Sequence, residues 1–319
     1  MGKSEDAGRG RQAARPRDIP TRGWRDILFR VKDEMARDKL SMIAAGVAFY
    51  GLLAIFPALA ALVSIYGLIL EPQAAQQQIA QLQGVLPQEA RSIVEEQLTR
   101  VTSSAQGALS LGVLGGLLLT LWSAGKGTKA LIEALNVVYD EEEKRGFIKL
   151  NAIALALTLG IVLFVIAALA LVAILPPLLS SLGLPEAVQA WARWLRWPIL
   201  AGAFMVALAV LYRYGPSREE PRWRWVSWGA AAATLLWIVG SVLFSWYVAN
   251  FGSYNETYGS VGAVAILMMW FWLSALIVLL GAELNAEMEH QTERDTTTGA
   301  PQPTGARGAY VADHVGEVP

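Results

Sequence analysis

Residues 251–289 read FGSYNETYGSVGAVAILMMWFWLSALIVLLGAELNAEME, a polar aromatic turn followed by an apolar run that ends in glutamates. Residues 261–282 of this stretch carry no charge. A helix of 22 residues spans about 33 Å, which is enough to cross the hydrocarbon core of a bilayer. Because lipid offers the backbone no hydrogen-bond partner, the stretch must form a helix there. The sequence therefore predicts a membrane protein.

The composition of the whole chain agrees with this prediction. Of the 319 residues, 54% are apolar and 17% are charged, whereas roughly 25% of the residues of a soluble domain are charged. The absence of cysteine excludes disulfides and thiolate metal sites. The formal net charge of −1 gives no reason to expect a nucleic acid as partner.

Uncharged windows predict an all-α, polytopic bundle of six transmembrane helices. The windows are residues 40–70, 101–125, 150–185, 197–212, 225–255 and 257–282. The fourth window is the shortest and needs residues 191–196 as well to cross the bilayer. Proline interrupts helical hydrogen bonding, so Pro57 and Pro176 predict kinks in the first and third spans.

Lysine and arginine set the orientation of these helices. Eleven of them precede the first window. The other loops on that side hold Lys144, Arg145 and Lys149, and then Arg213, Arg218, Arg222 and Arg224. The loops on the opposite side hold two, two and none. Because basic residues stay in the cytoplasm, both termini are predicted to be cytoplasmic.

The segments outside the spans differ in character. Residues 1–22 and 290–319 have little to bury and are predicted to be disordered cytoplasmic ends of a six-span domain at 23–289. Residues 24–39 predict an amphipathic helix, either on the inner leaflet or packed against the protein's own cytoplasmic loops. The loop between the first two spans carries an apolar stripe, which predicts an external amphipathic helical hairpin.

Residues suited to catalysis are scarce. Both histidines, His290 and His314, lie in the C-terminal tail, which leaves no Ser-His-Asp triad and no His-ligated zinc site within the spans. The carboxylates at 140–143 are typical of a solvated face where a helix leaves the membrane. We therefore expect no enzyme activity, no cofactor and no metal.

Candidate functional residues lie at the ends of the spans, since the span interiors hold no ionisable group that would mark a proton path. The external candidates form a polar gate before the sixth span: Tyr254, Asn255, Thr257, Tyr258 and Gly259. Turn formation and helix capping explain the same residues.

The internal candidates flank the inner ends of the second and sixth spans: Lys126, Lys129, Asn136, Glu283, Asn285 and Glu287. If these two spans touch, Lys126 or Lys129 would pair with Glu283. Such a pair, only partly hydrated at that depth, would fix helix register or serve in gating or headgroup binding.

Four stretches then resemble the YihY/BrkB family of bacterial inner-membrane proteins, historically mislabelled ribonuclease BN. They are AAGVAFYGLLAIFP at 44–57, LWSAGKGTKALIEALNVVY at 121–139, YNETYGSVG at 254–262 and GAELNAEME at 281–289. Their order and spacing match over roughly residues 25–290. The resemblance implies a six-span protein of the inner membrane with cytoplasmic termini. The family carries labels as a tRNA-processing ribonuclease and as a virulence factor, and is linked to movement of lipids or lipopolysaccharide precursors.

Two main hypotheses follow. The first is a protein that transports or handles lipids or lipid-like envelope components, with membrane lipids and an export-system protein as partners. The second is a non-transporting scaffold or assembly factor, which close helix packing without a cavity would favour. A ribonuclease is disfavoured because no catalytic constellation stands in the predicted ordered part. The sequence does not define the oligomeric state.

Overall fold

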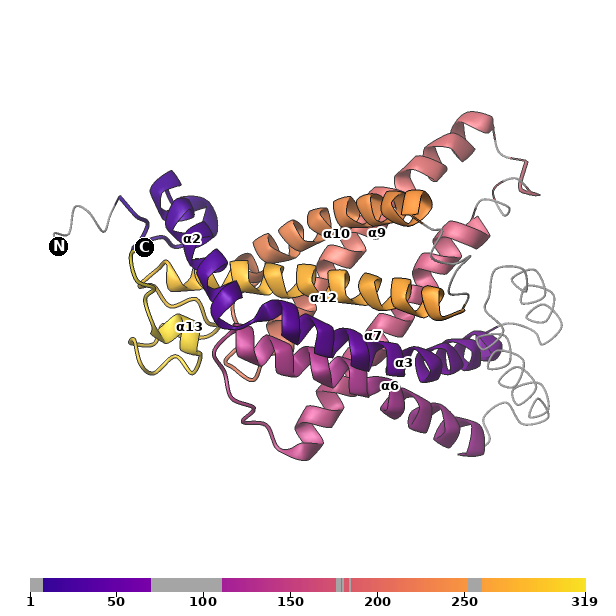
Figure 1. The fold of residues 1–319 in the computed structure, drawn as a ribbon, viewed down its shortest axis with the longest axis horizontal. Coiled ribbons are helices and arrows are strands. Elements are labelled where there is room, and N and C mark those ends of the chain that lie inside the picture. Colours follow the sequence, from indigo (N-terminus) through magenta and orange to yellow (C-terminus); the bar gives the residue numbers. More distant parts are fainter. Residues whose placement is uncertain (1–7, 70–110, 176–178, 180, 184, 252–259) are drawn as a thin grey trace. The chain divides into compact units, whose positions relative to one another are not determined.

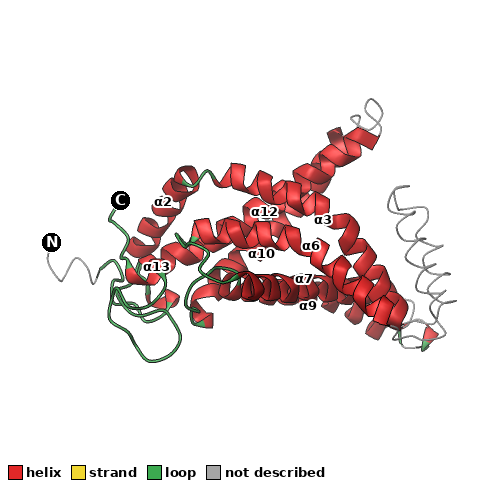
Figure 2. Ribbon diagram, turned by 90° about the horizontal axis from the view of Figure 1, so that it is seen from below, coloured by secondary structure: helices red, strands yellow, loops and turns green. Residues whose placement is uncertain are grey.

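A computed structural model describes residues 8–69, 111–175, 179, 181–183, 185–251 and 260–319. Over these residues the chain forms helices and loops without a strand, and extended backbone pairs at only one antiparallel bridge, between Pro221 and Thr297 (Figure 2). The predicted all-α class is confirmed.

Six long helices make up most of this structure (Figure 1). They are α3 (Leu40–Ile69), α6 (Leu111–Val138), α7 (Phe147–Leu169), α9 (Glu186–Tyr214), α10 (Trp223–Phe251) and α12 (Ser260–His290). The shorter elements are the 3-10 turn η1 (Pro16–Asp18), α2 (Thr21–Arg37), the π-helical segment η2 (Ala170–Ile174) and α13 (Tyr310–Asp313).

Among the described residues, five segments are long and apolar enough to cross a membrane. They are Leu40–Leu59, Phe147–Val172, Glu186–Tyr214, Trp223–Asn250 and Gly262–His290. Five of the six predicted spans therefore recur. The second predicted span is described only from residue 111 onward, within α6, and residues 70–110, with the predicted hairpin, lie outside the described part. Six spans, the hairpin and the orientation stay predictions.

Of the two prolines that predict kinks, the structure describes Pro57 but not Pro176. Pro57 lies inside α3, where it removes a backbone donor from the helix. Pro176 lies outside the described residues, directly after the π-helical segment η2 and Leu175. Its kink stays a prediction.

The chain divides into two compact units. Unit 1 comprises residues 1–49, 130–153 and 201–319, and unit 2 comprises residues 50–129 and 154–200. Helices α3, α6, α7 and α9 each contribute one part to unit 1 and the other part to unit 2.

Helices α10 and α12 lie side by side in unit 1 (Figure 1). They approach closely at Gly229 and Gly281, because a Cβ atom on Gly229 would collide with the carbonyl oxygen of Gly281. Asn285 joins the same crossing: its Oδ1 accepts the N–H of Gly229 at 2.8 Å, and its amide donates to the carbonyl of Val226 at 3.3 Å. Small residues and one amide thus hold the two spans together.

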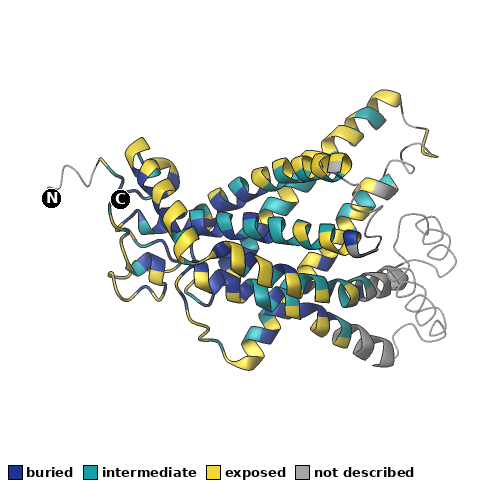
Figure 3. Ribbon diagram, viewed as in Figure 1, coloured by how far each residue is buried: buried dark blue, intermediate teal, exposed yellow. Residues whose placement is uncertain are grey.

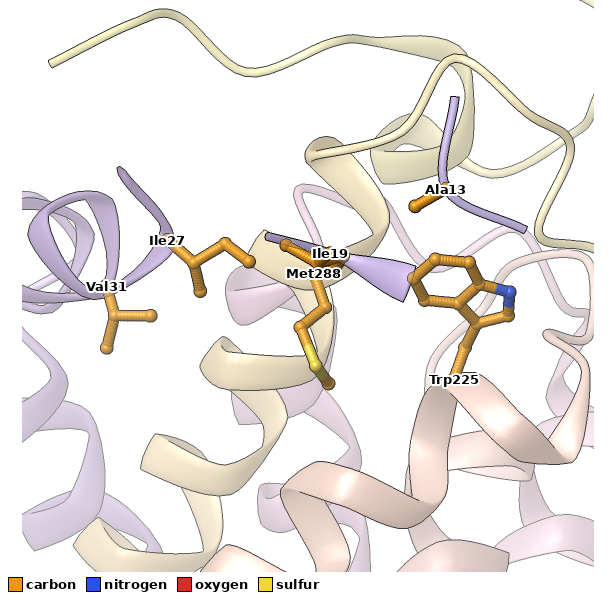
Figure 4. Packing of buried hydrophobic residues seen from close by; sticks show 6 residues of the cluster. All are labelled: Ala13, Ile19, Ile27, Val31, Trp225 and Met288. Carbon is orange, nitrogen blue, oxygen red and sulfur yellow. The ribbon is translucent and has the colours of Figure 1, made fainter. Parts of the chain in front are cut away.

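Helix α2 packs against the protein rather than lying free. A cluster of six buried side chains contains Ala13, Ile19, Ile27, Val31, Trp225 and Met288 (Figure 4). Ile27 and Val31 bring one face of α2 into this cluster, while the neighbouring Leu28 and Phe29 are exposed. The face of α2 that carries Ile27 thus packs on the protein itself, chiefly on Trp225 of α10 and Met288 of α12. Whether α2 also lies on the inner leaflet stays a prediction.

Residues 290–319 differ from the disorder that their composition predicts. Thr292, Thr296 and Val311 are buried, and α13 lies in this segment. Arg307 donates to the carbonyls of Glu293 and Ala312 at 2.7 and 2.5 Å. The physical reason is that polar side chains order this segment by donating hydrogen bonds to backbone carbonyls. The prediction of disorder considers only how much apolar surface a segment can bury.

The N-terminal segment differs from its prediction in the same way, from residue 8 onward. Arg11 and Ala13 are buried. The Arg11 guanidinium donates to the carbonyl of Gly316 at 2.6 Å, and the hydroxyl of Thr292 donates to the carbonyl of Ala13 at 2.8 Å. The two terminal segments therefore order one another.

Unit 2 contains a smaller apolar cluster, formed by Ala61, Leu121 and Val162. Gly127 of α6 faces α3, where an added Cβ atom would lie 3.1 Å from that of Ala54. Thr128 and Thr158 share a buried hydrogen bond of 2.7 Å that joins α6 to α7.

Asp38 lies in unit 1, between α2 and α3, and offers a test of the fold at that point. Burial raises its pKa to about 6 from 3.8, and Asp140 and Glu34 add to the rise against the opposing effect of Arg37. Because the folded-state pKa is the higher one, stability falls as the pH rises from about 4 to about 6. We expect Asp38→Asn to raise the melting temperature at pH 8 and to leave it unchanged at pH 3.5. Equal melting temperatures at pH 8 would contradict this placement of Asp38.

Candidate functional site

A cavity of about 390 Å³ lies in unit 1, where α7 begins and α9 ends. Its lining includes one acidic residue, Glu220, and five basic residues: Lys144, Arg145, Lys149, Arg213 and Arg218. The volume is within the range of sites for small ligands. We call this feature the basic cavity.

Two of the five cations, Arg145 and Arg213, make most of their contacts within the protein, although Nε of Arg213 has no hydrogen-bond partner among the described residues. Arg145 donates to both carboxylate oxygens of Glu143 at 2.7 Å, and to the carbonyls of Tyr214 and Gly215 at 3.2 and 2.8 Å. It thereby binds the carbonyls left open at the end of α9. Arg213 donates to Glu220 at 2.7 Å and to the carbonyl of Pro221. These two side chains chiefly shape the walls of the cavity.

Arg218 differs because its side chain is wholly buried and two of its donors have no partner among the described residues. Its side chain is 0% exposed, and Nη2 donates to Glu289 at 2.6 Å. Its Cζ lies 4.2 Å from the centre of the Tyr139 ring. Its Nε and Nη1 atoms have no hydrogen-bond partner in the described part of the chain. Burial alone lowers the pKa of Arg218, but Glu289 and Tyr139 more than offset it, so the pKa is raised and the guanidinium stays charged.

The two lysines give the cavity its accessible charge. Lys144 is largely exposed and pairs with Glu141 at 2.7 Å. Lys149 is exposed and makes no ion pair with any described residue. The five cations face four carboxylates, namely Glu220 and the paired Glu141, Glu143 and Glu289. The cluster therefore keeps a net charge of 5 − 4 = +1.

Asn136 positions the loop that forms the cavity wall. Its Oδ1 accepts the N–H of Ser217 at 2.7 Å, and its amide donates to Glu143 at 3.1 Å. The hydroxyl of Ser217 in turn accepts the N–H of Lys144 at 2.9 Å. The loop before α7 and the loop after α9 are thus joined through one buried amide.

Glu143 gives this network a testable acid limit. Hydrogen bonds from Arg145, with a smaller one from Asn136, lower its pKa to about 2. Since the folded-state pKa is below the ordinary 4.5, the stability that Glu143 contributes is present above pH 4.5 and is lost as the pH falls to about 2. We expect Glu143→Gln to lower the melting temperature at pH 7 and to have a shrinking effect below pH 4.5. Glu142→Gln, which removes an exposed neighbouring carboxylate, is the control; an equal effect of both changes would contradict the prediction.

The predicted residues near the C-terminal end of α12 lie close together, and two of them make contacts that hold helices to one another. Figure 3 shows the buried residues of α12 concentrated toward its C-terminal end, which includes Glu283, Asn285 and Glu287. Asn285 clasps α10, as described above, and Glu287 pairs with Arg30 of α2. The Oε2 atom of Glu283 has no hydrogen-bond partner among the described residues.

The other predicted residues are not joined to this group. Lys126 and Lys129 belong to unit 2, where the Lys129 ammonium lies 4.9 Å from the centre of the Trp122 ring. Their pairing with Glu283, which belongs to unit 1, stays a prediction. The external candidates lie outside the described residues: Tyr254, Asn255, Thr257, Tyr258 and Gly259.

From the sequence alone, the cations of the basic cavity predict only the orientation of the helices in the membrane. One signal was available: residues 144–149 and 213–218 contribute cations on the same predicted side of the membrane. The sequence does not predict that these two loops lie next to each other. Their contact depends on the hydrogen bond between Asn136 and Ser217.

Residues 31–305 match the model of the family described as virulence factor BrkB. The chain belongs to the BrkB family. A ribonuclease-like protein of Bacillus subtilis (strain 168), YfkH, is 32% identical to this BrkB-family protein over 252 residues, which cover 76% of this chain and 88% of YfkH. A UPF0761 membrane protein of Tolumonas auensis is 28% identical over 268 residues, covering 79% of this chain and 81% of its own. No solved structure matches the chain.

These relatives and the five apolar helices establish a multi-pass membrane protein of the BrkB family. The described residues contain no group of three or more His, Asp or Glu side chains that could hold a metal ion.

Proposed function

We propose that this BrkB-family protein transports or handles anionic lipids or lipid-like envelope components in the bacterial inner membrane. The observation that carries the proposal is the basic cavity. It lies at the start of α7 and the end of α9, two helices that are long and apolar enough to cross a membrane. Cations at the ends of spans attract the anionic headgroups of the inner leaflet. Phe147 and Ile148, exposed beside Lys149, add apolar surface that suits an amphiphile.

The proposal includes six spans with both termini in the cytoplasm. The contact between Arg11 and Gly316 supports it, since segments that touch outside the membrane lie on the same side, which requires an even number of crossings. Five spans are described, and we infer that the part of α6 before residue 130 belongs to the sixth span. The excess of lysine and arginine assigns that side to the cytoplasm.

Transport is tested with the purified full-length protein in liposomes that contain a fluorescent phosphatidylglycerol. We expect the label to exchange between leaflets faster than in protein-free liposomes or in liposomes with heat-denatured protein. Exchange at the protein-free rate, together with unchanged envelope lipids in a deletion strain, would rule the proposal out.

A non-transporting scaffold is the second candidate, and the close crossing of α10 and α12 favours it. Gly229, Gly281 and Asn285 leave no room between these two helices. A scaffold would co-purify with protein components of an envelope export system and show no lipid exchange. We expect no ribonuclease activity: tRNA precursors incubated with the metal-supplemented protein should remain intact.

A further inference from the structure

We propose that one face of α2 binds the anionic lipids of the cytoplasmic leaflet. We call this surface the outer face, and it consists of five exposed residues: Arg22, Arg25, Leu28, Phe29 and Lys32. The inference goes beyond the proposed function, because none of these residues lines the basic cavity. It takes from that proposal only the assignment of α2 to the cytoplasmic side.

Both ends of α2 lie where membrane-spanning helices begin. In its first turn, the ring of Trp24 lies 5.8 Å from the ring of Trp228, near the start of α10. At its other end, α3 begins at Leu40, three residues after α2 ends. Helices α3 and α10 both contain a segment that is long and apolar enough to cross a membrane. The two ends of α2 therefore hold it at the level of the membrane surface.

The turn between α2 and α3 sets the direction of α2. Lys39 has a φ of +53°, in the left-handed region that L-residues rarely adopt, so α2 and α3 do not form one continuous helix. Figure 1 shows that α2 runs across the direction of α12, on which it packs, rather than along it. A helix that runs across the spans at this level can place one side against the leaflet.

The position of Leu28 shows which side that is. Trp24 and Met35 lie at the edge of the packed face of α2 and are only partly buried. Leu28 comes four residues after Trp24 and seven before Met35, so it lies on the same edge of the helix, where it is 60% exposed. Because Trp24 contacts an aromatic ring at the start of a span, this edge is the one directed toward the bilayer.

The outer face combines apolar and cationic side chains. Phe29, beside Leu28, is 45% exposed, and Cζ of Arg25 lies 5.5 Å from the centre of its ring. Lys32 follows Leu28 by four residues and is exposed on the same side of the helix. Long basic side chains cover apolar surface with their methylene groups while their charges reach the headgroups. This combination suits the boundary between acyl chains and headgroups.

The charge of α2 favours anionic lipids over zwitterionic ones. Its exposed residues include four cations and one carboxylate, Asp33, which gives a net charge of 4 − 1 = +3. The four cations are Arg22, Arg25, Lys32 and Arg37. Basic residues at the surface of the cytoplasmic leaflet are attracted to its anionic headgroups.

The first test uses single-cysteine variants of the full-length protein, whose own sequence has no cysteine. Leu28→Cys carries a fluorophore on the outer face, and Asp33→Cys carries the same fluorophore on an exposed residue about 140° around the helix. The protein is placed in liposomes whose lipids carry a nitroxide quencher on the acyl chain near the headgroup. We expect the lipid nitroxide to quench the label at residue 28 several-fold more strongly than the label at residue 33, and aqueous iodide to show the reverse.

The second test compares nitroxide-labelled phosphatidylglycerol with nitroxide-labelled phosphatidylcholine in otherwise identical liposomes. We expect the anionic lipid to quench the label at residue 28 more strongly. Lys32→Gln should lower this preference by up to about fivefold, the effect of one cation near an anionic surface. Arg37→Gln is the matched control, because Arg37 lies on the opposite side of α2 and pairs with Glu34, and it should keep the preference.

The quenching pattern distinguishes the possible occupants of the outer face. If iodide quenches the labels at residues 28 and 33 equally, the face lies in water and the inference is overturned. If neither quencher reaches the label at residue 28, protein covers the face, as a second copy of this chain would, and the inference is again overturned. Equal quenching by the two lipids would overturn the preference for anionic lipids. Lipid exchange is measured separately, so failure of this contact differs visibly from failure of transport.

Discussion

Gly229→Ala is expected to destabilise the protein by about 3 kcal/mol or more, because it places a methyl group where α10 and α12 touch. The added Cβ atom would collide with the carbonyl oxygen of Gly281 and lie 2.5 Å from Cγ of Asn285. The obstruction is backbone and a buried amide, so no flexible side chain can move away. The two helices would have to separate, and the hydrogen bond from Gly229 to Asn285 would be lost.

Thermal unfolding of the detergent-solubilised protein measures this effect. Gly202→Ala is the matched control, since it lies in α9 of the same unit and an added Cβ atom meets nothing within 4 Å. We expect the control to melt near the wild-type temperature and Gly229→Ala to melt many degrees lower. Equal melting temperatures for the two variants would mean that α10 and α12 do not cross at this glycine.

Arg30→Met is expected to have the second large effect. The Arg30 guanidinium pairs with the buried carboxylate of Glu287 and also donates to Gln291 Oε1 at 2.7 Å and to the carbonyl of Glu317 at 3.2 Å. Removing it leaves the buried Glu287 carboxylate with the ring of His290, 3.3 Å away, as its remaining side-chain partner among the described residues. Loss of one member of a buried pair costs about 3–5 kcal/mol.

A double-variant cycle isolates this interaction. Adding Glu287→Gln to Arg30→Met removes the unpaired carboxylate, so the double variant should be more stable than Arg30→Met alone. Arg37→Met is the control, because Arg37 is 75% exposed, pairs with the nearby Glu34, and should contribute less than about 1 kcal/mol. A double variant no more stable than the single one would show that the carboxylate is not buried against Arg30.

The fold could be predicted where local chemistry decides it. A window such as 225–255 must become a helix in lipid because its length and lack of charge leave its backbone no other partner. The helix at 24–39 was predicted from its apolar spacing, but not the surface that it covers. That surface includes Met288, more than 250 residues further along the chain.

The terminal segments and the basic cavity could not be predicted, for one physical reason. Their order comes from single polar contacts between distant segments, such as Arg11 with Gly316 or Asn136 with Ser217. Composition counts how much apolar surface a segment can bury and is blind to such contacts. The sequence predicts Asn136 as a candidate, but it does not predict the partner of Asn136, Ser217, in the loop after α9.

The contacts of Arg11 and Arg30 also bear on how the protein is made. Both arginines are synthesised more than 250 residues before their acceptors at Glu287, Gly316 and Glu317. These hydrogen bonds can form only after residues 287–317 have been synthesised, however many spans have already inserted. A chain that stops before residue 287 would lack all of these contacts, so we expect proteases to degrade it faster than the chain that contains them.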